Sequence, residues 1–485
     1  MEIKDLKPAQ IWDYFYQITQ VPRPSKKEEK IVRFLIDFAE QNGLEVLKDA
    51  ANNVLIKKPA TTGKENLKTV ILQSHVDMVC EKNSDTIFNF ETDPIQTRIE
   101  NGWVKAKGTT LGADDGIGIA AALAILASKD MEHGPIVALF TSDEETGLTG
   151  ATALQKEFLA GDILINLDSE EWSEFCIGCA GGKSTIGTFT YSKIAVPEDY
   201  FWFEVQVSGL NGGHSGSDIN VGLGNANKIL TRYLWNLQQE CPVVLATIDG
   251  GNLHNAIARE AKSTAGVPVA FKEQTIVFLN QLQAQVSAEL AKVDPNVQLS
   301  IQSVEVPQDC IDFETGKKLI NTLYALPHGV FGMSHEISGL VETSTNLASV
   351  KMKDDCKIVI TTSQRSSTES LKINIVNKVM SVFQLAGAEV VSTEGYPGWK
   401  PNSDSTVLKL SNSIYEKLFS EQPKVIAIHA GLECGLFFEK NPGLDMISCG
   451  PTILGAHSPD ERIEIDTVEK WWEFLIELLK AIPAK

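Results

Sequence analysis

Several short stretches of this sequence combine histidine and carboxylate side chains in a way that could hold metal ions. The first is His75-Val76-Asp77. Residues i and i+2 of a strand face the same side, so the imidazole and the carboxylate can point into one pocket. Either both side chains bind a metal ion, or Asp77 orients the ring of His75. A polar strand end in solvent would have the same sequence, so this pair alone does not establish a site.

A pair of adjacent carboxylates, Asp114-Asp115, lies in the glycine-flanked run 111–116. Glycines suit a tight turn that brings the backbone close to a ligand. Two neighbouring carboxylates repel each other, so a nearby cation would stabilise them. The alternative is a helix N-cap, where aspartate is also favourable.

Three further stretches with acidic or histidine residues complete the set. Asp143-Glu144-Glu145 places three carboxylates in a row, and an acidic surface loop is the alternative interpretation. Asp168 and His457 follow later in the chain. Two imidazoles with several carboxylates, and no thiolate, suit zinc, manganese or cobalt.

The positions of these residues carry more weight than any one motif. Four apolar runs predict strands, and each has a carboxylate or histidine at or just beyond its carboxyl end. Ligands of open α/β sheets bind at that edge. The ligands exceed the need of one tetrahedral ion, so we expect two ions sharing a bridging carboxylate, with a remaining glutamate as general base. The four runs are residues 69–72, 136–140, 163–167 and 445–449.

The elements between these strands predict an α/β unit. Ser25 and Glu28 have the spacing of a capping box before a helix over 31–38. Asn101-Gly102 predicts a hairpin turn. Helices are expected over 117–126, 148–158, 405–418 and 468–479.

The pattern changes after about residue 182. Alternating strands are expected over 203–207, 297–304 and 357–361, beside helices over 225–237, 278–290 and 371–383. The breaker-rich run 396–401 predicts a linker. We therefore expect a discontinuous α/β catalytic domain with a mainly parallel sheet over 1–182 and 399–485, and an inserted α+β domain over 183–398.

The composition is that of a globular protein with an acidic surface. The 485 residues include 63 Asp and Glu against 43 Lys and Arg, which gives a net charge of -20. This balance argues against nucleic acid as a partner. The most apolar run, residues 116–127, is too short for a membrane span, and the charged N-terminus predicts no signal peptide. Scattered cysteines favour a reducing cytoplasm.

At these motifs the sequence resembles the M20 family of metallopeptidases, and within it the aminoacyl-histidine dipeptidase branch. The resemblance extends over nearly the whole chain. It rests on KPATTGKEN, QSHVDMV, KGTTLGADDGIG, GCAGG, GGHSG, NVGLGNANK, HAGLECG and GPTILGAHSPDE.

The resemblance implies a role for each residue of the candidate centre. Asp114 would bridge two ions, and its peptide bond to the next residue would be cis. Asp77 would orient a ligand, and Glu144 would be the general base. The first ion would be bound by His75 and Asp168, and the second by Glu145 and His457.

The resemblance identifies the inserted domain as a lid that commonly dimerises. It also implies roles for three residues of this domain. His214 would stabilise the oxyanion at the scissile carbonyl, and Asn255 and Arg365 would hold the substrate. Arg365 suits a C-terminal carboxylate through bidentate pairing. We add Glu433 as a candidate for the amino group of the substrate.

The expected function is hydrolysis of small unblocked dipeptides by two divalent ions, most simply zinc, with preference for a C-terminal histidine and including β-alanyl-histidine. Asp168 favours this branch, because the deacylase-like branch has glutamate there. The alternatives are an N-acyl amino acid deacylase on the same scaffold, a non-catalytic peptide-binding scaffold and a two-metal phosphoesterase. A homodimer is expected from the family.

Overall fold

The computed structural model of the protein describes residues 2–485, which separate into two compact units. The first unit runs to Gly178 and resumes over Trp399–Ala427 and Leu432–Lys485. The second comprises Cys179–Gly398 and Ile428–Gly431. The sequence-based boundaries at 182/183 and 398/399 lie close to these, but they left 428–431 in the first unit.

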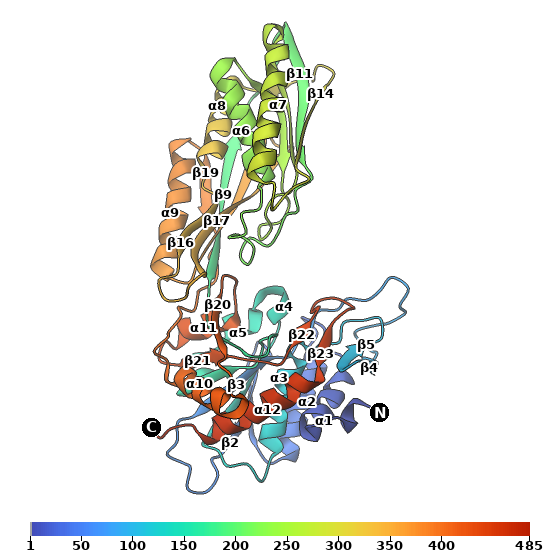
Figure 1. Ribbon diagram of the computed structural model, residues 1–485, viewed down its shortest axis with the longest axis vertical. Helices are drawn as coiled ribbons and strands as arrows, with labels where there is room; N and C mark the ends of the chain where they lie inside the picture. The colour runs from blue at the N-terminus through green and yellow to red at the C-terminus, as the bar shows by residue number, and fades with distance from the viewer. Residues whose placement is uncertain (1) are drawn as a thin grey trace. The chain divides into compact units, whose positions relative to one another are not determined.

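An eight-stranded mixed sheet forms the centre of the first unit (Figure 1), with the order β1-β2-β6-β3-β7-β21-β8-β20. Its central strands β6, β3, β7 and β21 are parallel, whereas β1, β2 and β8 pair antiparallel. This confirms the α/β class; the sheet is parallel at its centre and mixed as a whole. The strands are β1 (Glu45–Lys48), β2 (Val54–Lys58), β3 (Val70–His75), β6 (Ile136–Thr141), β7 (Ile163–Asn166), β8 (Glu174–Cys179), β20 (Lys424–Ile428) and β21 (Asp445–Ser448).

The sequence explains why these strands lie at the centre. Every residue of β3, β6 and β7 is buried, as continuous apolar runs of a parallel sheet covered on both faces require. A separate antiparallel sheet of order β22-β23-β5-β4 contains the expected hairpin at Asn101-Gly102, both with positive φ. Its strands are β4 (Thr97–Glu100), β5 (Trp103–Ala106), β22 (Ile453–Leu454) and β23 (Arg462–Glu464).

Helices of the first unit include the expected buried one, α3 (Ala113–Ala127), which is buried along nearly its whole length. The helix predicted over 31–38 is α2 (Glu29–Gln41), and those predicted near the C-terminus are α10 (Thr406–Phe419) and α12 (Ile465–Lys480). The others are α1 (Ala9–Thr19), α4 (Glu144–Gly147), α5 (Thr149–Ala153), α11 (Glu433–Lys440) and the 3-10 turns η1 (Ile3–Asp5) and η2 (Lys156–Leu159).

Two local predictions in this unit are wrong. Ser25 does not cap α2; its hydroxyl donates to Asp77 Oδ2 at 2.8 Å, a partner 52 residues away. The helix expected over 148–158 is broken, because Leu148 has a positive φ of 54° and Leu154 is extended. Close packing of Gly150 explains part of the break, since a Cβ there would lie 2.4 Å from the carbonyl oxygen of Ser142.

The second unit is built on an antiparallel sheet of order β14-β11-β13-β12-β17-β18-β9-β19, with β16 pairing β17. The strands predicted at 203–207, 297–304 and 357–361 are β11, β14 and β18, and they confirm the α+β character. The strands are β9 (Gly181–Thr190), β11 (Tyr200–Ser208), β12 (Val244–Gly250), β13 (Ala261–Pro268), β14 (Gln298–Ser303), β16 (Gly329–Met333), β17 (Val341–Lys353), β18 (Lys357–Ser366) and β19 (Glu389–Ser392), with a small β10–β15 pair at Lys193–Ile194 and Cys310–Ile311.

Four helices pack against this sheet around a core that includes Phe203, Leu234 and Phe383 (Figure 1). Three of them were predicted from helical periodicity. They are α6 (Ala226–Glu240), α7 (Lys272–Glu289), α8 (Phe313–Ala325) and α9 (Glu369–Leu385), with the 3-10 turn η3 at Val269–Phe271. Within residues 2–485, none of the helices has the length and apolar character needed to cross a bilayer.

Candidate metal centre

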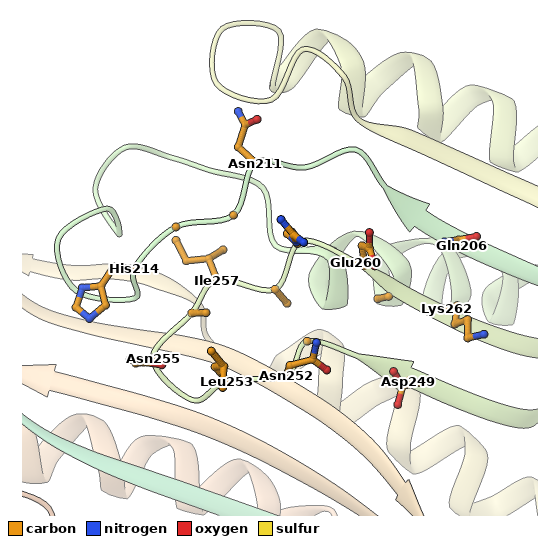
Figure 2. Close-up of a pocket in the computed structure, with 17 residues that line it drawn as sticks. Gln206, Asn211, His214, Asp249, Asn252, Leu253, Asn255, Ile257, Glu260 and Lys262 are labelled. Carbon is orange, nitrogen blue, oxygen red and sulfur yellow. The ribbon is translucent and has the colours of Figure 1, made fainter. Parts of the chain in front are cut away.

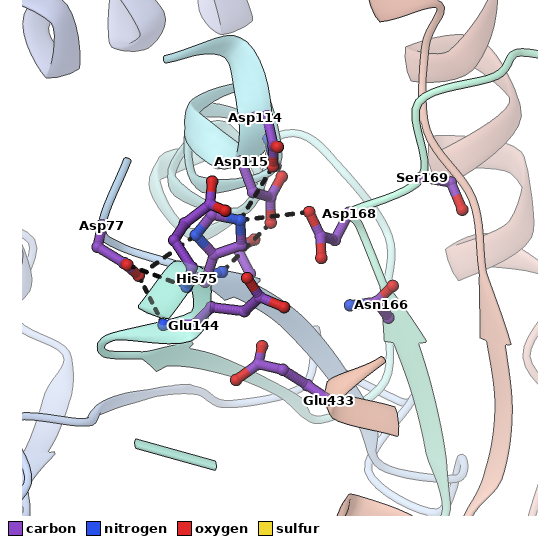
Figure 3. A network of polar contacts seen from close by, with 12 residues as sticks. His75, Asp77, Asp114, Asp115, Glu144, Asn166, Asp168, Ser169 and Glu433 are labelled. Atoms are coloured by element: carbon purple, nitrogen blue, oxygen red, sulfur yellow. Dashed lines mark hydrogen bonds and ion pairs between the residues drawn. The ribbon is translucent and has the colours of Figure 1, made fainter. Parts of the chain in front are cut away.

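The parallel strands of the first unit bring the candidate ligands together. His75 is the last residue of β3, and Glu144 begins α4 just beyond the neighbouring strand β6. Asp168 lies two residues beyond β7, the other neighbour of β3. Carboxyl ends of adjacent parallel strands share one edge, and α3, which carries Asp114 in its first turn, begins at that edge (Figure 3).

Asp114 lies between two groups of ligands and turns one carboxylate oxygen to each. Its Oδ1 is 3.0 Å from His75 Nε2, and Asp168 Oδ1 is 3.4 Å from the same nitrogen. Its Oδ2 is 3.1 Å from His457 Nε2, which is also 3.0 Å from Glu145 Oε2. All five residues expected to bind metal therefore converge, and the Asp114–Asp115 peptide bond is cis.

The ionisation of this cluster is strongly perturbed. Burial alone would lower the pKa of His75, but three neighbouring carboxylates raise it well above its usual value. Hydrogen bonds to Asp114 and Glu145 raise the pKa of His457 to about 11. Burial raises the pKa of Asp168 well above its usual value. Without a metal, the two imidazoles thus hold protons that neutralise crowded carboxylates.

These residues fit divalent metal ions. Glu145 Oε1 is buried and has no hydrogen-bond partner within residues 2–485, which leaves it available to a cation. The donor set of imidazoles and carboxylates is one that zinc, manganese and cobalt accept. Cations in place of the imidazole protons would stabilise the ionised carboxylates. The Nε2 atom of each histidine would then be free to coordinate.

Asp77 and Glu144 support this cluster in different ways. Asp77 Oδ1 lies 3.4 Å from His75 Nδ1 and accepts from the backbone N–H of Glu144 at 3.0 Å. Burial raises the pKa of Asp77, but its hydrogen bonds outweigh this and lower it to about 2. For the half-buried Glu144, burial and nearby carboxylates raise the pKa to about 8. A carboxyl group with a pKa near neutrality is suited to proton transfer.

Glu433 at the start of α11 extends towards the same cluster (Figure 3). Its Oε2 accepts from Gln73 Nε2 at 2.7 Å and from Thr141 Oγ1 at 2.8 Å, while its buried Oε1 has no hydrogen-bond partner among residues 2–485. Gln73 in turn accepts from Asn166 at 2.6 Å. Only 2% of Glu433 is exposed, so it does not line an open surface.

In the second unit, His214 and Arg365 lie together. His214 Nδ1 lies 3.1 Å from the backbone nitrogen of Ser217 and 3.3 Å from that of Gly216, and its Nε2 lies 3.5 Å from Arg365 Nη2, so both ring nitrogens face donors. Burial and the charge of Arg365 lower the pKa of His214, which favours the neutral imidazole.

Arg365 on β18 has only 5% of its surface exposed and forms no ion pair with a carboxylate among residues 2–485. Its Nη1 donates to Tyr396 Oη at 2.7 Å, and its buried Nε has no partner in the described chain. A buried guanidinium with unused donors is suited to an anionic group of a ligand.

Asn255 lies beside His214, because its carbonyl oxygen accepts from Ser215 N at 2.8 Å. His214 and Asn255 both line a cavity of about 750 Å³ within the second unit (Figure 2). Asn211, Arg259 and Glu260 also line it. The sequence-predicted residues of the second unit thus fall into one region, as those of the first unit do.

The structure adds residues whose roles the sequence did not reveal. Arg23 and Glu461 are buried beside the ligand-bearing segments, and Tyr396 contacts Arg365. Glu461 lies in the GPTILGAHSPDE stretch, four residues after His457, and that nearness was the one available signal. No signal in the sequence pointed to Arg23, because its hydrogen-bond partners lie 53 to 89 residues away.

Comparison with known proteins identifies a family over most of the chain. Residues 71–481 match the model of peptidase family M20/M25/M40. The chain is 44% identical over 484 residues to the cytosol non-specific dipeptidase of Escherichia coli (strain K12), and the match covers 100% of both proteins.

Solved structures agree with this assignment. The crystal structure of aminoacylhistidine dipeptidase from Vibrio alginolyticus matches with a TM-score of 0.95 and 43% identity, covering 100% of this chain and 99% of that one. A tripeptidase from Staphylococcus aureus matches with a TM-score of 0.56 and 16% identity, covering 98% and 99%. The second likeness shows a shared fold only.

Proposed function

This chain belongs to peptidase family M20/M25/M40, and on that premise we propose that it is a dipeptidase acting on small unblocked dipeptides. We propose a preference for a C-terminal histidine, including β-alanyl-histidine. The two proteins that it matches over their full lengths are both named dipeptidases, one of them for aminoacyl-histidine substrates. The observation that carries the proposal is the Asp114 carboxylate, with one oxygen facing each imidazole.

Two divalent ions, zinc before cobalt or manganese, are the proposed cofactors. His75, Asp168 and Asp114 Oδ1 would hold one ion, and His457, Glu145 and Asp114 Oδ2 the other. Such ions lower the pKa of water and polarise a carbonyl group when they are bound. Asp77 would keep the ring of His75 in its coordinating orientation.

Proton transfer is assigned to Glu144. Its carboxylate would take a proton from the attacking water and deliver it to the nitrogen of the leaving amine. Its pKa of about 8 refers to the metal-free chain, and nearby cations would lower it towards the range of a base that is ionised at neutral pH. The bond from its N–H to Asp77 would fix the start of α4.

Substrate contacts are assigned mainly to the second unit. The imidazole of His214 would stabilise the carbonyl oxygen that becomes negative, and Arg365 would pair with the C-terminal carboxylate. Asn255 beside His214 would hold the peptide. Glu433 stays a proposed partner of the substrate's ammonium through Oε1, although its 2% exposure requires neighbouring side chains to open around it.

A substrate panel tests the proposal. Free dipeptides with different C-terminal residues, β-alanyl-histidine and N-acetyl amino acids would be compared with and without a chelator. We expect hydrolysis of the free dipeptides only, fastest with C-terminal histidine, and its loss with chelator. Hydrolysis of N-acetyl amino acids alone would favour a deacylase, and no hydrolysis with fewer than one ion per chain would favour a binding scaffold.

We also propose a homodimer and a cytosolic location. The name of the E. coli relative supports the location. The edge strand β16 supports the dimer, because Val330, Phe331 and Met333 expose 38%, 44% and 44% of their surface. Exposed apolar side chains on an unpaired strand edge are typical of surfaces that pair with another chain.

A further inference from the structure

Two buried charged residues that would not bind metal contact the segments that carry the ligands. Arg23 is 3% exposed and lies before α2. Its Nη1 donates to the carbonyl oxygens of Val76 at 2.9 Å and Asp77 at 2.5 Å, just beyond His75. Its Nη2 donates to the carbonyl oxygen of Gly112. One guanidinium thus joins the end of β3 to the turn before Asp114.

Glu461 holds the same turn from its other side. Only 2% of it is exposed, and its Oε2 accepts from the backbone N–H groups of Leu111 at 2.7 Å and Gly112 at 3.0 Å. Its Oε1 accepts from Ala113 at 2.7 Å and Asp114 at 3.3 Å. Four successive N–H groups therefore bind a carboxylate that comes from the segment carrying His457.

The turn needs these bonds because it is not regular helix. Asp114 and Asp115 have non-helical backbone angles inside the first turn of α3. The first N–H groups of a helix have no intrahelical partner, and Glu461 satisfies them here. Glycine permits the approach of Arg23, since a Cβ at either Gly112 or Gly116 would lie 2.7 Å from its Nη2.

We propose that Arg23 and Glu461 are positioning residues that hold the Asp114 carboxylate between its two ligand groups and thereby set the affinity of the metal centre. The inference rests on the proposed two-ion function. A bridging carboxylate binds two ions only if each oxygen keeps its direction, and Asp114 belongs to a turn whose backbone bonds come from these two residues. Loss of groups that orient metal ligands typically weakens metal binding tenfold to a hundredfold.

Metal titration of chelator-treated protein tests the pair. Glu461→Gln keeps the shape but replaces one acceptor oxygen with an NH₂ group that faces N–H donors. Arg23→Lys keeps the charge but removes the planar fork. Asp445→Asn is the matched control, because the Asp445 carboxylate accepts from Val407 N at 2.9 Å and Ser405 Oγ at 2.6 Å in the same unit.

The readouts are the stoichiometry and affinity of Zn²⁺ by calorimetry, the visible spectrum of the Co²⁺-loaded protein, and the melting temperature of the metal-free protein. We expect both test variants to lose at least tenfold in affinity for one or both ions and to show an altered Co²⁺ spectrum. Asp445→Asn is expected to lower the melting temperature while affinity and spectrum stay native.

Native affinity and spectrum in both variants would overturn the inference, whatever their melting temperatures. Failure of both variants to fold, while Asp445→Asn folds, would also overturn it, because the pair would then serve the fold. A native chain that binds fewer than two ions would instead contradict the proposed function, and the titration of the unmodified protein shows this independently of the variants.

Discussion

Asp114 and Glu144 illustrate how one cluster gives similar carboxyl groups opposite ionisation. Burial raises the pKa of Asp114, but hydrogen bonds to His457 and His75 outweigh it and keep the group ionised. Within residues 2–485 the side chain of Glu144 makes no such bonds, so burial and neighbouring carboxylates raise its pKa to about 8. The first is suited to hold cations, and the second to exchange protons.

Replacing Glu144 by glutamine tests this division of roles. Glu144→Gln is expected to bind two ions per chain but to lose about 10²–10⁴-fold in kcat, because the proton acceptor is gone while the ligands remain. Metal analysis and dipeptide turnover measure both quantities. Glu157→Gln, at an exposed position of η2, is the control. A kcat near that of the native protein would show that Glu144 is not the base.

Arg365 offers a second test at this scale. Arg365→Met is expected to raise the KM for free dipeptides about 10- to 100-fold, the value of a charge-assisted hydrogen bond. The same variant would act on dipeptide amides as the native protein does, because they lack the carboxylate. Arg232→Met, which breaks an exposed ion pair with Glu289, is the control. Equal effects on acids and amides would refute carboxylate recognition.

Helix α3 shows how an element serves the metal centre. Gly118 N donates to Asp115 Oδ1 at 3.1 Å, and Asp115 Oδ2 accepts from His75 N at 3.3 Å. The first turn of the helix is thereby bound to the end of β3. A Cβ at Gly118 would lie 2.3 Å from Asp115 Oδ1, so this glycine is required by close approach.

Alanine substitution therefore has opposite effects in two helices. Gly118→Ala is expected to destabilise the protein by about 1–3 kcal/mol, since overpacking at a buried carboxylate outweighs the gain in helix propensity. Gly316→Ala in α8, where an added Cβ meets nothing within 4 Å, is expected to stabilise it by about 0.5–1 kcal/mol. Chemical denaturation measures both. Equal signs would contradict this account.

His328 makes the second unit sensitive to acid. Its Nδ1 accepts from Leu347 N at 3.4 Å, and burial together with the charge of Lys228 lowers its pKa to about 4. Between pH 4 and about 6.5 the unfolded chain binds more protons at this residue than the folded chain does, so the free energy of unfolding falls as the pH falls through this range.

Thermal melts at pH 7 and pH 5 test this sensitivity. Because the raised pKa values of Glu144 and Asp168 stabilise the metal-free protein as the pH falls, the His328 effect is measured as a difference: acidification from pH 7 to pH 5 is expected to shift the melting temperature further upward in His328→Gln than in the native protein. His254→Gln, at an exposed position, is the control. The same shift of the melting temperature between pH 7 and pH 5 in His328→Gln and in the native protein would contradict the role of His328.

Local patterns in the sequence predicted most elements but not how they are joined. Strands and helices with clear periodicity, such as β7 and α12, lie where expected. Ser25 had the spacing of a cap, yet it donates to Asp77, because a cap motif contains no information on a partner 52 residues away. The helix over 148–158 was predicted wrongly for a similar reason, since Gly150 packs against the backbone of Ser142 and the side chain of Asn53.

The candidate site was predictable to the extent that its residues stand in recognisable motifs. The ligands follow apolar runs, and the geometry of parallel strands brings such ends together. Arg23 and Glu461 bind backbone groups, which every residue possesses, so their partners leave no mark in the sequence. Glu433 was singled out by sequence, but its burial and its bonds to Gln73 and Thr141 depend on the folded sheet.

At the scale of the whole molecule, two features affect the association of one chain with a second copy: the net charge of -20 and the exposed apolar edge of β16. We expect a particle of twice the chain mass of 53.0 kDa. Light scattering after size-exclusion chromatography measures it. Phe331→Lys, placed on the β16 edge, is expected to shift the particle towards one chain, and Val277→Lys, at an exposed position of helix α7, serves as control. A native particle of 53.0 kDa would contradict the dimer.

The short stretch Ile428–Gly431 has a consequence for anyone who wishes to cut the protein apart. Because it belongs to the second unit while its flanks belong to the first, the polypeptide passes from one unit to the other four times. His429 within it bonds to Ser344 Oγ at 2.7 Å, and Ala180 N donates to Ala430 O at 3.0 Å. Neither unit is therefore a single contiguous fragment. A gene truncated to residues 179–398 would encode the sheet of the second unit without residues 428–431, which bond to it.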